Sequence, residues 1–222
     1  MASFFTKESL AFLRELKQNN NREWFQQNKQ RFEDVVRTPM LEFIGAFAPH
    51  LKRISRHFVA DASPTRGSMF RIYRDIRFSE DKSPYKTHVA AHFSHSRAGK
   101  EVHTPGFYLH IEPGACFCGA GVWHPDAQTL VRIRRAIIEN AATWKKLRRS
   151  VEVHGDKLSN PPKGVPKEHP LIEDLKHKDF VATQTFSDSE VCSATFLNHY
   201  VDACKQVAPL VKFLTRALRL PY

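Results

Sequence analysis

The sequence predicts a single α+β domain spanning residues 1–222, with a mainly antiparallel β-sheet packed against N-terminal and C-terminal helices. Apolar residues recur at helical spacing near both ends of the chain, whereas the middle alternates apolar and polar residues as strands do. The chain is 41% hydrophobic and contains 17 Phe, enough for a core. It has no signal-peptide pattern and no apolar run of about 20 residues, so we expect no membrane segment and a cytoplasmic location.

The N-terminal part is predicted to be helical. Apolar spacing places helices within residues 6–20, 21–36 and 39–54. Thr6 is a typical N-cap, and the Asn residues at 19–21 are expected to end the first helix. Thr38 is predicted to cap the third helix, with Pro39 in its first turn.

Strands are predicted where the period changes from 3.6 to 2. The alternation favours strands at residues 69–78 and 87–95, and a hairpin over residues 106–123 that turns at Pro113-Gly114. Cys116 and Cys118 of the hairpin would share one strand face. No C-x-x-C motif accompanies them, so we expect reduced, buried thiols and not metal ligands.

The last third of the chain is predicted to return to helices around one strand. Asp126 would cap a helix that continues to Leu147. Its polar faces carry Arg132, Arg134, Arg135, Lys145, Lys146, Arg148 and Arg149. A short helix at 169–177 and a strand at 179–186 follow, and Ser187 or Asp188 would open the closing helices.

The densest group of charged and aromatic side chains lies in RIYRDIRFSEDKSPYKTH, residues 71–88. The formal net charge of +11 favours anionic partners. Arginine recognises phosphate and carboxylate groups through two parallel hydrogen bonds. We therefore predict a site for a small anionic ligand in this stretch. The predicted ligand-binding residues are Arg71, Arg74, Asp75, Arg77, Lys82, Tyr85 and Lys86.

Arg74 departs from the strand pattern, because it falls on the face that should be buried. A buried guanidinium is costly unless it is paired and hydrogen-bonded. Three arrangements satisfy it. Asp75, Asp81 or Glu112 pairs with it, a bulge turns it outward, or it meets a ligand in a cavity.

Acid–base chemistry is predicted near the second strand of the hairpin region. His110 and Glu112 are two residues apart and would project to one side of a strand, and with Tyr85 they are our candidate catalytic groups. Together with His88 or His92 they also have the composition of a two-His, one-carboxylate metal site. Twelve His residues would produce such combinations by chance, so we predict no metal and no cofactor.

The chain resembles a known family over almost its whole length. NNREWFQQNKQRFE, RIYRDIRFSEDKSPYKTH, GFYLHIEPG and GAGVWHPD carry the resemblance, together with HPLIEDLK and APLVKFLTRAL. The family is catalogued as domain of unknown function 2461. The resemblance implies a single cytoplasmic α+β domain and assigns no reaction, substrate, cofactor or catalytic residue.

Three functions remain open. The first is an anion-binding pocket, with or without catalysis, in which the arginines hold a phosphate or carboxylate and, in an enzyme, a His or Glu moves the proton. The second is nucleic-acid binding, with bases stacked on Tyr73, Tyr85 and Phe107 and phosphates tracked by residues 132–149. The third is a scaffold whose arginines are architectural, so that Arg74→Ala destabilises the fold strongly and Arg77→Ala does little.

Several enzyme classes lack their signatures here. The chain contains neither the G-x-x-x-x-G-K-[ST] phosphate loop nor the G-x-S-x-G nucleophile motif. The sequence specifies neither the oligomeric state nor whether a reaction takes place.

Overall fold

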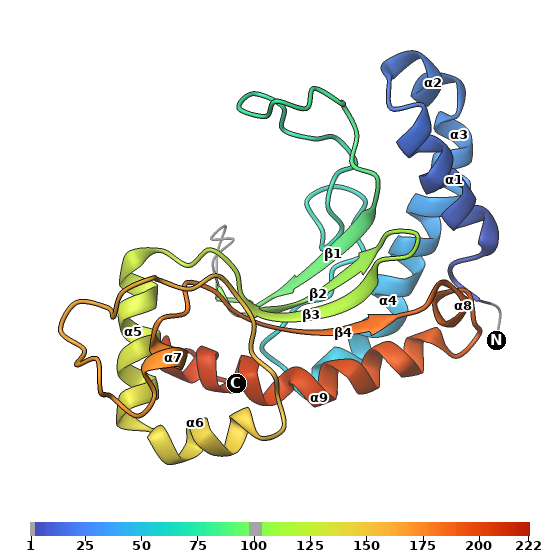
Figure 1. Cartoon of the computed structure of the whole chain (residues 1–222). Helices are drawn as coiled ribbons and strands as arrows, with labels where there is room; N and C mark the ends of the chain where they lie inside the picture. Colours follow the sequence, from blue (N-terminus) through green and yellow to red (C-terminus); the bar gives the residue numbers. More distant parts are fainter. Residues whose placement is uncertain (1–2, 98–103) are drawn as a thin grey trace.

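The computed structural model of the chain describes residues 3–97 and 104–222 (Figure 1). One antiparallel sheet has the strand order β1-β2-β3-β4. Its strands are β1 (Val89–Ser94), β2 (Gly106–Ile111), β3 (Cys116–Val122) and β4 (Phe180–Phe186). The helical elements are α1 (Lys7–Gln18), α2 (Arg22–Gln27), α3 (Lys29–Phe32), η1 (Glu33–Arg37), α4 (Thr38–Ile54), α5 (Ala127–Glu139), α6 (Ala141–Arg148), α7 (Ile172–Leu175), α8 (Asp188–Val191) and α9 (Phe196–Ala217). The predicted α+β fold class is confirmed.

Local capping explains where several helices begin. The Thr6 side chain accepts a hydrogen bond from the Ser9 backbone and forms a capping box at the start of α1. Asp126 caps α5 as the sequence predicts, and of the two predicted candidates Ser187 and Asp188 it is Ser187 that caps α8. The helix predicted to run from Asp126 to Leu147 is divided instead, because Asn140 leaves helical geometry between α5 and α6.

The predicted N-cap at Thr38 is wrong. Thr38 has helical dihedral angles, φ −58° and ψ −49°, because α3, η1 and α4 follow one another without a break. The π-helical turn η1 ends directly before it. Such a turn widens the helix next to Pro39, which lacks the N–H of a regular α-helical hydrogen bond.

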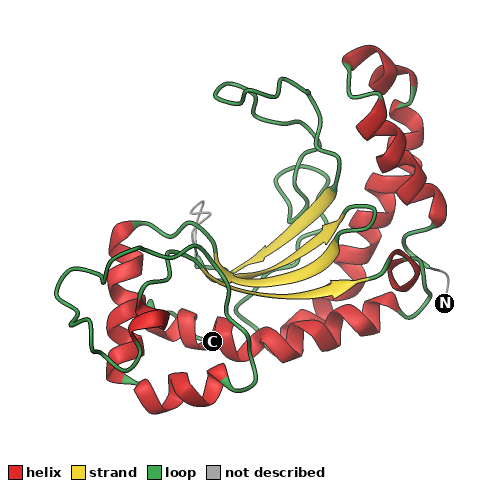
Figure 2. Cartoon of the chain, viewed as in Figure 1, coloured by secondary structure: helices red, strands yellow, loops and turns green. Residues whose placement is uncertain are grey.

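The apolar face of the sheet packs on α9 and α4. Phe93 of β1 contacts Phe47 of α4 and Tyr200 of α9, with ring centroids 4.8 and 6.3 Å away. Figure 2 shows α9 running along one side of the sheet, away from the long loop that precedes β1. Leu109 and Cys118 are fully buried on this face. The opposite face is therefore the one left for polar side chains.

The hairpin between β2 and β3 turns where it was predicted. The Ala115 N–H donates to the Glu112 carbonyl, and Gly114 has a φ of +79°, a backbone conformation that glycine adopts without strain. Of the four free cysteines, Cys116 and Cys118 in β3 and Cys204 in α9 are buried. Cys192 is partly exposed, and the expectation of buried thiols at Cys116 and Cys118 is confirmed.

The predicted strand at residues 69–78 does not form. This segment makes only isolated bridges, Met69 to Ala91 and Tyr73 to Tyr85, and the Phe78 side chain is 95% exposed. Short-range hydrogen bonds replace a ladder here. Arg77 binds the carboxylate of Asp75 two residues away, which holds the chain in a local turn.

No helix in the described part of the chain combines the length and apolar character needed to cross a membrane.

Candidate functional site

A group of polar side chains lies on the sheet face opposite α9. The β1–β2 register pairs Val89 with Ile111 and Ala90 with His110. Continuing this register places His88 opposite Glu112, next to His110 and on the same face, because side chains alternate along a strand. We call His88, His110 and Glu112 the His–Glu cluster. Their potential ligand atoms all lie within 4.8 Å of one another.

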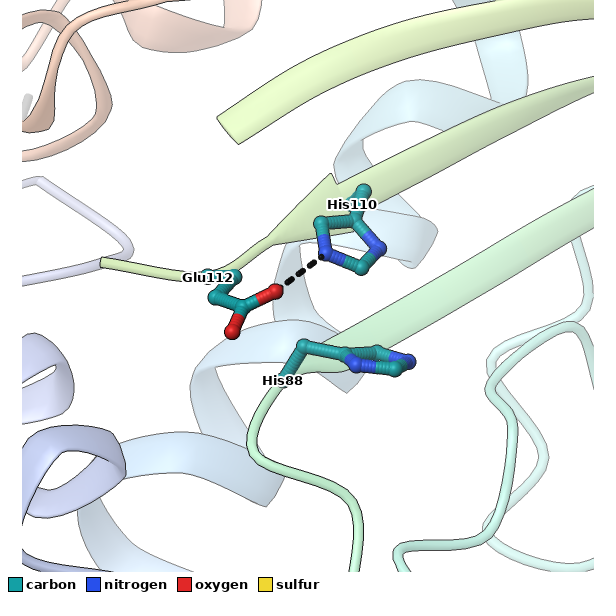
Figure 3. Close-up of side chains that lie close together, drawn as sticks. All are labelled: His88, His110 and Glu112. Atoms are coloured by element: carbon teal, nitrogen blue, oxygen red, sulfur yellow. Dashed lines mark hydrogen bonds and ion pairs between the residues drawn. The ribbon is translucent and has the colours of Figure 1, made fainter. Parts of the chain in front are cut away.

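Hydrogen bonds orient two members of the His–Glu cluster (Figure 3). His110 Nε2 lies 3.3 Å from Glu112 Oε2, and His110 Nδ1 lies 3.1 Å from the Tyr108 hydroxyl. The Thr87 hydroxyl donates to the other carboxylate oxygen, Glu112 Oε1, at 3.2 Å. Lys17 Nζ is 3.8 Å from that same oxygen. Tyr108, His110 and Glu112 therefore form a continuous chain of hydrogen-bonding groups.

His88 is placed differently from His110. Its ring lies over the His110 ring with the centroids 4.2 Å apart. Within residues 3–97 and 104–222, neither of its ring nitrogens forms a hydrogen bond. The Figure 3 view shows the Glu112 carboxylate turned toward His110, with the His88 ring beside them.

Burial sets the protonation of the cluster. It lowers the pKa of His88 to about 4, assisted by the neighbouring His110, and it also lowers the pKa of His110. Burial alone would raise the pKa of Glu112, but hydrogen bonds from His110 and Thr87 outweigh it and leave the pKa lowered. Burial raises the pKa of Tyr108 to about 12. At neutral pH the imidazoles are uncharged, the carboxylate is ionised and the phenol keeps its proton.

A cleft of about 370 Å³ adjoins the His–Glu cluster. We call it the Lys86 cleft, and its lining includes Lys17, Arg74, Asp81, Lys86 and His88. It lies between the α1–α2 connection and the loop before β1. Asn20 joins these two walls, because its side chain donates to the Tyr85 carbonyl and accepts from the Tyr85 N–H.

Lys86 is the cation of this cleft that lacks an acidic partner. Its Nζ donates to the Arg71 carbonyl at 3.0 Å and lies 5.2 Å from the centre of the Phe70 ring. No carboxylate in the described chain is within ion-pair distance of it. The ammonium is half-buried, and burial together with the charge of Arg71 lowers its pKa.

The other predicted ligand-binding cations are mostly paired internally. Arg74 forms an ion pair with Asp81, one of the three partners that the sequence suggested, and it also donates to Ser79. Arg77 pairs with Asp75 at 2.7 Å. Lys82 donates to the Ile76 carbonyl at 3.1 Å. Arg74 and Lys86 line the cleft, whereas the other predicted residues except Tyr85 are absent from its lining, namely Arg71, Asp75, Arg77 and Lys82.

Tyr85 lines the Lys86 cleft but stands apart from the His–Glu cluster. Its ring stacks on Phe25 with centroids 4.1 Å apart, and only 2% of the residue is exposed. It forms no hydrogen bond with His110 or Glu112 in the described chain. The hydroxyl that contacts His110 belongs to Tyr108, which sequence reasoning missed. Its position two residues before His110, on one strand face, was the available signal.

A second basic surface lies between α5, α6 and α9. A groove of about 960 Å³, which we call the helical groove, is lined by cations from these helices and the residues after α9. The cations are Arg132, Arg135, Lys146, Lys212, Arg216 and Arg219. Glu139, the one acidic residue of its lining within the described chain, pairs with Arg135 at 2.7 Å. The sequence indicated the basic character of residues 132–149 but not the contribution of α9.

Comparison with known proteins identifies the family. No curated protein matches the chain. The family model described as "Conserved hypothetical protein (DUF2461)" matches residues 8–213. This range includes the His–Glu cluster, the lining of the Lys86 cleft and most of the lining of the helical groove. The chain therefore belongs to the DUF2461 family.

Proposed function

We propose that this protein binds a small ligand carrying a phosphate or carboxylate group in the Lys86 cleft. The observation that supports the proposal is the half-buried ammonium of Lys86, which has no acidic partner in the described chain. A buried charge without a counter-charge is costly, and a bound anion removes that cost.

The charges around the cleft favour the same ligand class. Lys17, Arg74 and Lys86 line it, and among the described residues Asp81 provides the one carboxylate of the lining. Asp81 is already engaged by Arg74, and Ser83 donates to it through both its N–H and its hydroxyl. The carboxylate is thus compensated within its own loop, which leaves Lys86 as the main electrostatic attraction for a ligand.

The neighbouring cluster suits proton transfer from such a ligand. His88 lines the cleft and lies over His110, whose Nε2 contacts Glu112. An uncharged imidazole beside a carboxylate is a typical general base. If the ligand is a substrate, His110 and Glu112 are our candidates for accepting its proton, and Lys86 for stabilising the negative charge that develops.

Thermal unfolding with inorganic phosphate tests the proposal. We expect phosphate to raise the Tm of the wild-type protein, since a ligand at 100 times its Kd stabilises a fold by about 2.7 kcal/mol. Lys86→Met keeps the apolar stem and removes the charge, so its Tm should not respond. Lys82→Met is the matched control, because Lys82 lies in the same loop outside the cleft. An equal response from all three proteins, or none from wild type with phosphate, pyrophosphate and acetate, contradicts the proposal.

Nucleic-acid binding is a second candidate function, supported by the helical groove. Five of its cations, Arg132, Lys146, Lys212, Arg216 and Arg219, have no carboxylate within ion-pair distance in the described chain. A groove that gathers such cations suits the phosphate backbone of a nucleic acid. Of the three aromatic residues predicted to stack on bases, Phe107 and Tyr85 are buried and do not support it, whereas Tyr73 is exposed.

Salt dependence separates this second candidate from nonspecific attraction. Binding to single-stranded RNA and duplex DNA would be measured between low and physiological salt, with Lys212→Ala/Arg216→Ala as the test variant and Arg77→Ala/Lys82→Ala as the control. Each cation that stops neutralising a phosphate should reduce the slope of log K against log salt by about 0.9 for duplex DNA and about 0.7 for single strands. Identical slopes for the two variants would contradict the assignment to the helical groove.

A further inference from the structure

We propose that His88, His110 and Glu112 together bind one divalent transition-metal ion, with Zn²⁺ as the reference ion. This inference goes beyond anion binding in the Lys86 cleft and does not depend on it. Among the described residues, this is the one group of three or more His, Cys, Asp or Glu side chains close enough to share an ion.

The spacing of the ligand atoms is close to that of a metal site. Tetrahedral ligands at 2.0–2.1 Å from Zn²⁺ lie about 3.4 Å from one another. His110 Nε2 and Glu112 Oε2 are 3.3 Å apart, so this pair already has the required separation. No pair in the cluster exceeds 4.8 Å, and side-chain rotation of His88 can supply the remaining approach.

The surrounding side chains hold the ligands in a suitable orientation. The Tyr108 hydroxyl contacts His110 Nδ1, which leaves Nε2 directed at Glu112. Thr87 and Lys17 engage Glu112 Oε1, so Oε2 is the oxygen that faces the histidines. Metal-binding histidines and carboxylates in proteins are positioned by partners of this kind.

His88 has both ring nitrogens available for coordination. Its side chain is partly buried, yet neither ring nitrogen has a hydrogen-bond partner in the described chain. Neither nitrogen is among the fully buried polar atoms of the described chain, so His88 can turn toward an ion shared with His110 without breaking a hydrogen bond.

The donor set identifies the class of ion. Two imidazole nitrogens and one carboxylate oxygen suit Zn²⁺, Fe²⁺ or Co²⁺, whereas Mg²⁺ and Ca²⁺ prefer oxygen ligands throughout. Three protein ligands leave at least one coordination position open. His88 also lines the Lys86 cleft, so an open position on that side would be accessible to a ligand bound there.

Metal titration of the full chain tests the inference. The protein would be stripped with a chelator, transferred to phosphate-free buffer and titrated with Co²⁺, whose visible absorption reports coordination, and with Zn²⁺ in competition. We expect one ion per chain. His88→Ala and Glu112→Gln should each weaken binding by at least about 100-fold. His199→Ala should bind as wild type does, because His199 is exposed on α9.

Two outcomes would overturn the inference. The first is the absence of saturable binding by wild type, which leaves Tyr108, His110 and Glu112 as a hydrogen-bonded chain without an ion. The second is unchanged affinity in both ligand variants when circular dichroism shows that they are folded. If His88→Ala fails to fold, the near-isosteric Glu112→Gln variant and the wild-type titration still test whether the cluster binds a metal ion. Lys86→Met should retain metal binding, which separates this result from failure of the anion proposal.

Discussion

The imidazole rings of His88 and His110 lie with their centroids 4.2 Å apart, although they come from different segments of the chain. The contact arises from the β1–β2 register, which pairs Ala90 with His110 and so brings the residue before β1 beside it. Both rings belong to the sheet face that is turned away from α9. That face holds the proposed metal site and borders the Lys86 cleft.

Removing the Tyr108 hydroxyl should weaken metal binding without unfolding the protein. In Tyr108→Phe, His110 Nδ1 loses the partner that sets its ring orientation. Outer partners of metal ligands typically contribute 10- to 100-fold in affinity, so we expect a Co²⁺ Kd raised by about that factor. Tyr73→Phe, at a tyrosine that is 48% exposed, is the control. Equal affinities in the two variants would show that Tyr108 does not position His110.

Arg74 and Arg77 should differ in their effect on stability. Arg74 is partly buried and connects Asp81 with Ser79, whereas Arg77 is largely exposed and pairs with Asp75 two residues away. Exposed pairs contribute little because water and salt screen them. We expect Arg74→Ala to lower the Tm and Arg77→Ala to leave it nearly unchanged in thermal unfolding. The reverse order would show that the Arg74–Asp81 pair does not organise the loop.

His177 should make stability decrease in mild acid. It is 3% exposed, its Nδ1 has no hydrogen-bond partner among the described residues, and it lies near Lys157, Arg148 and Asp174. Burial is the main cause of its lowered pKa, and the positive charge of Lys157 adds to it. An unfolded His titrates near about 6.5. The stabilisation is therefore fully present above that pH and is lost as the pH falls toward the folded pKa.

The His177→Gln variant isolates this contribution. For one proton, the slope is at most about 1.4 kcal/mol per pH unit below the unfolded pKa. Urea unfolding at pH 7.5, 6.5 and 5.5 should show the cost of His177→Gln shrinking as the pH falls, since wild type alone loses the His177 contribution. Other histidines titrate equally in both proteins and cancel. A cost that is constant or grows in acid would contradict a neutral buried His177.

Thiol reagents should distinguish Cys192 from the other cysteines. Cys116, Cys118 and Cys204 are buried, and burial raises the pKa of Cys116 to about 11. Cys192 is partly exposed. With iodoacetamide and mass spectrometry we expect Cys192 to be labelled first in the native protein, and all four to react after denaturation. Rapid native labelling of Cys118 or Cys204 would indicate that the interface between β3 and α9 opens readily.

Two glycines with positive φ should tolerate alanine very differently. Gly121 of β3 has a φ of +125°, and a Cβ there would collide with the Phe180 carbonyl of β4. Gly114 has a φ of +79° in the hairpin turn, with open space around it. We expect Gly114→Ala to cost about 1 kcal/mol and Gly121→Ala at least about 3 kcal/mol in urea unfolding. Similar costs would show that the β3–β4 backbones can move apart.

Residues close to one another in sequence determined much of the secondary structure. The caps at Thr6, Asp126 and Ser187 and the turn at Pro113-Gly114 were predictable, because each depends on hydrogen bonds or dihedral angles within a few residues. The local sequence pattern gave a wrong prediction at residues 69–78, where the alternation of apolar and polar residues favoured a strand. There, side-chain and turn hydrogen bonds hold the backbone outside the ladder.

The candidate site was decided by tertiary structure. The sequence located His110 and Glu112 on one strand face, but only the β1–β2 register selects His88 over His92 as their neighbour. Likewise, composition placed many cations in residues 71–86. Folding determines that Arg74 and Arg77 pair with carboxylates, whereas Lys86 pairs with none in the part of the chain that the structure describes. The periodicity of apolar residues in the sequence specifies which face of a strand or helix a side chain lies on. Which distant group it meets depends on strand register and packing, which local sequence does not encode.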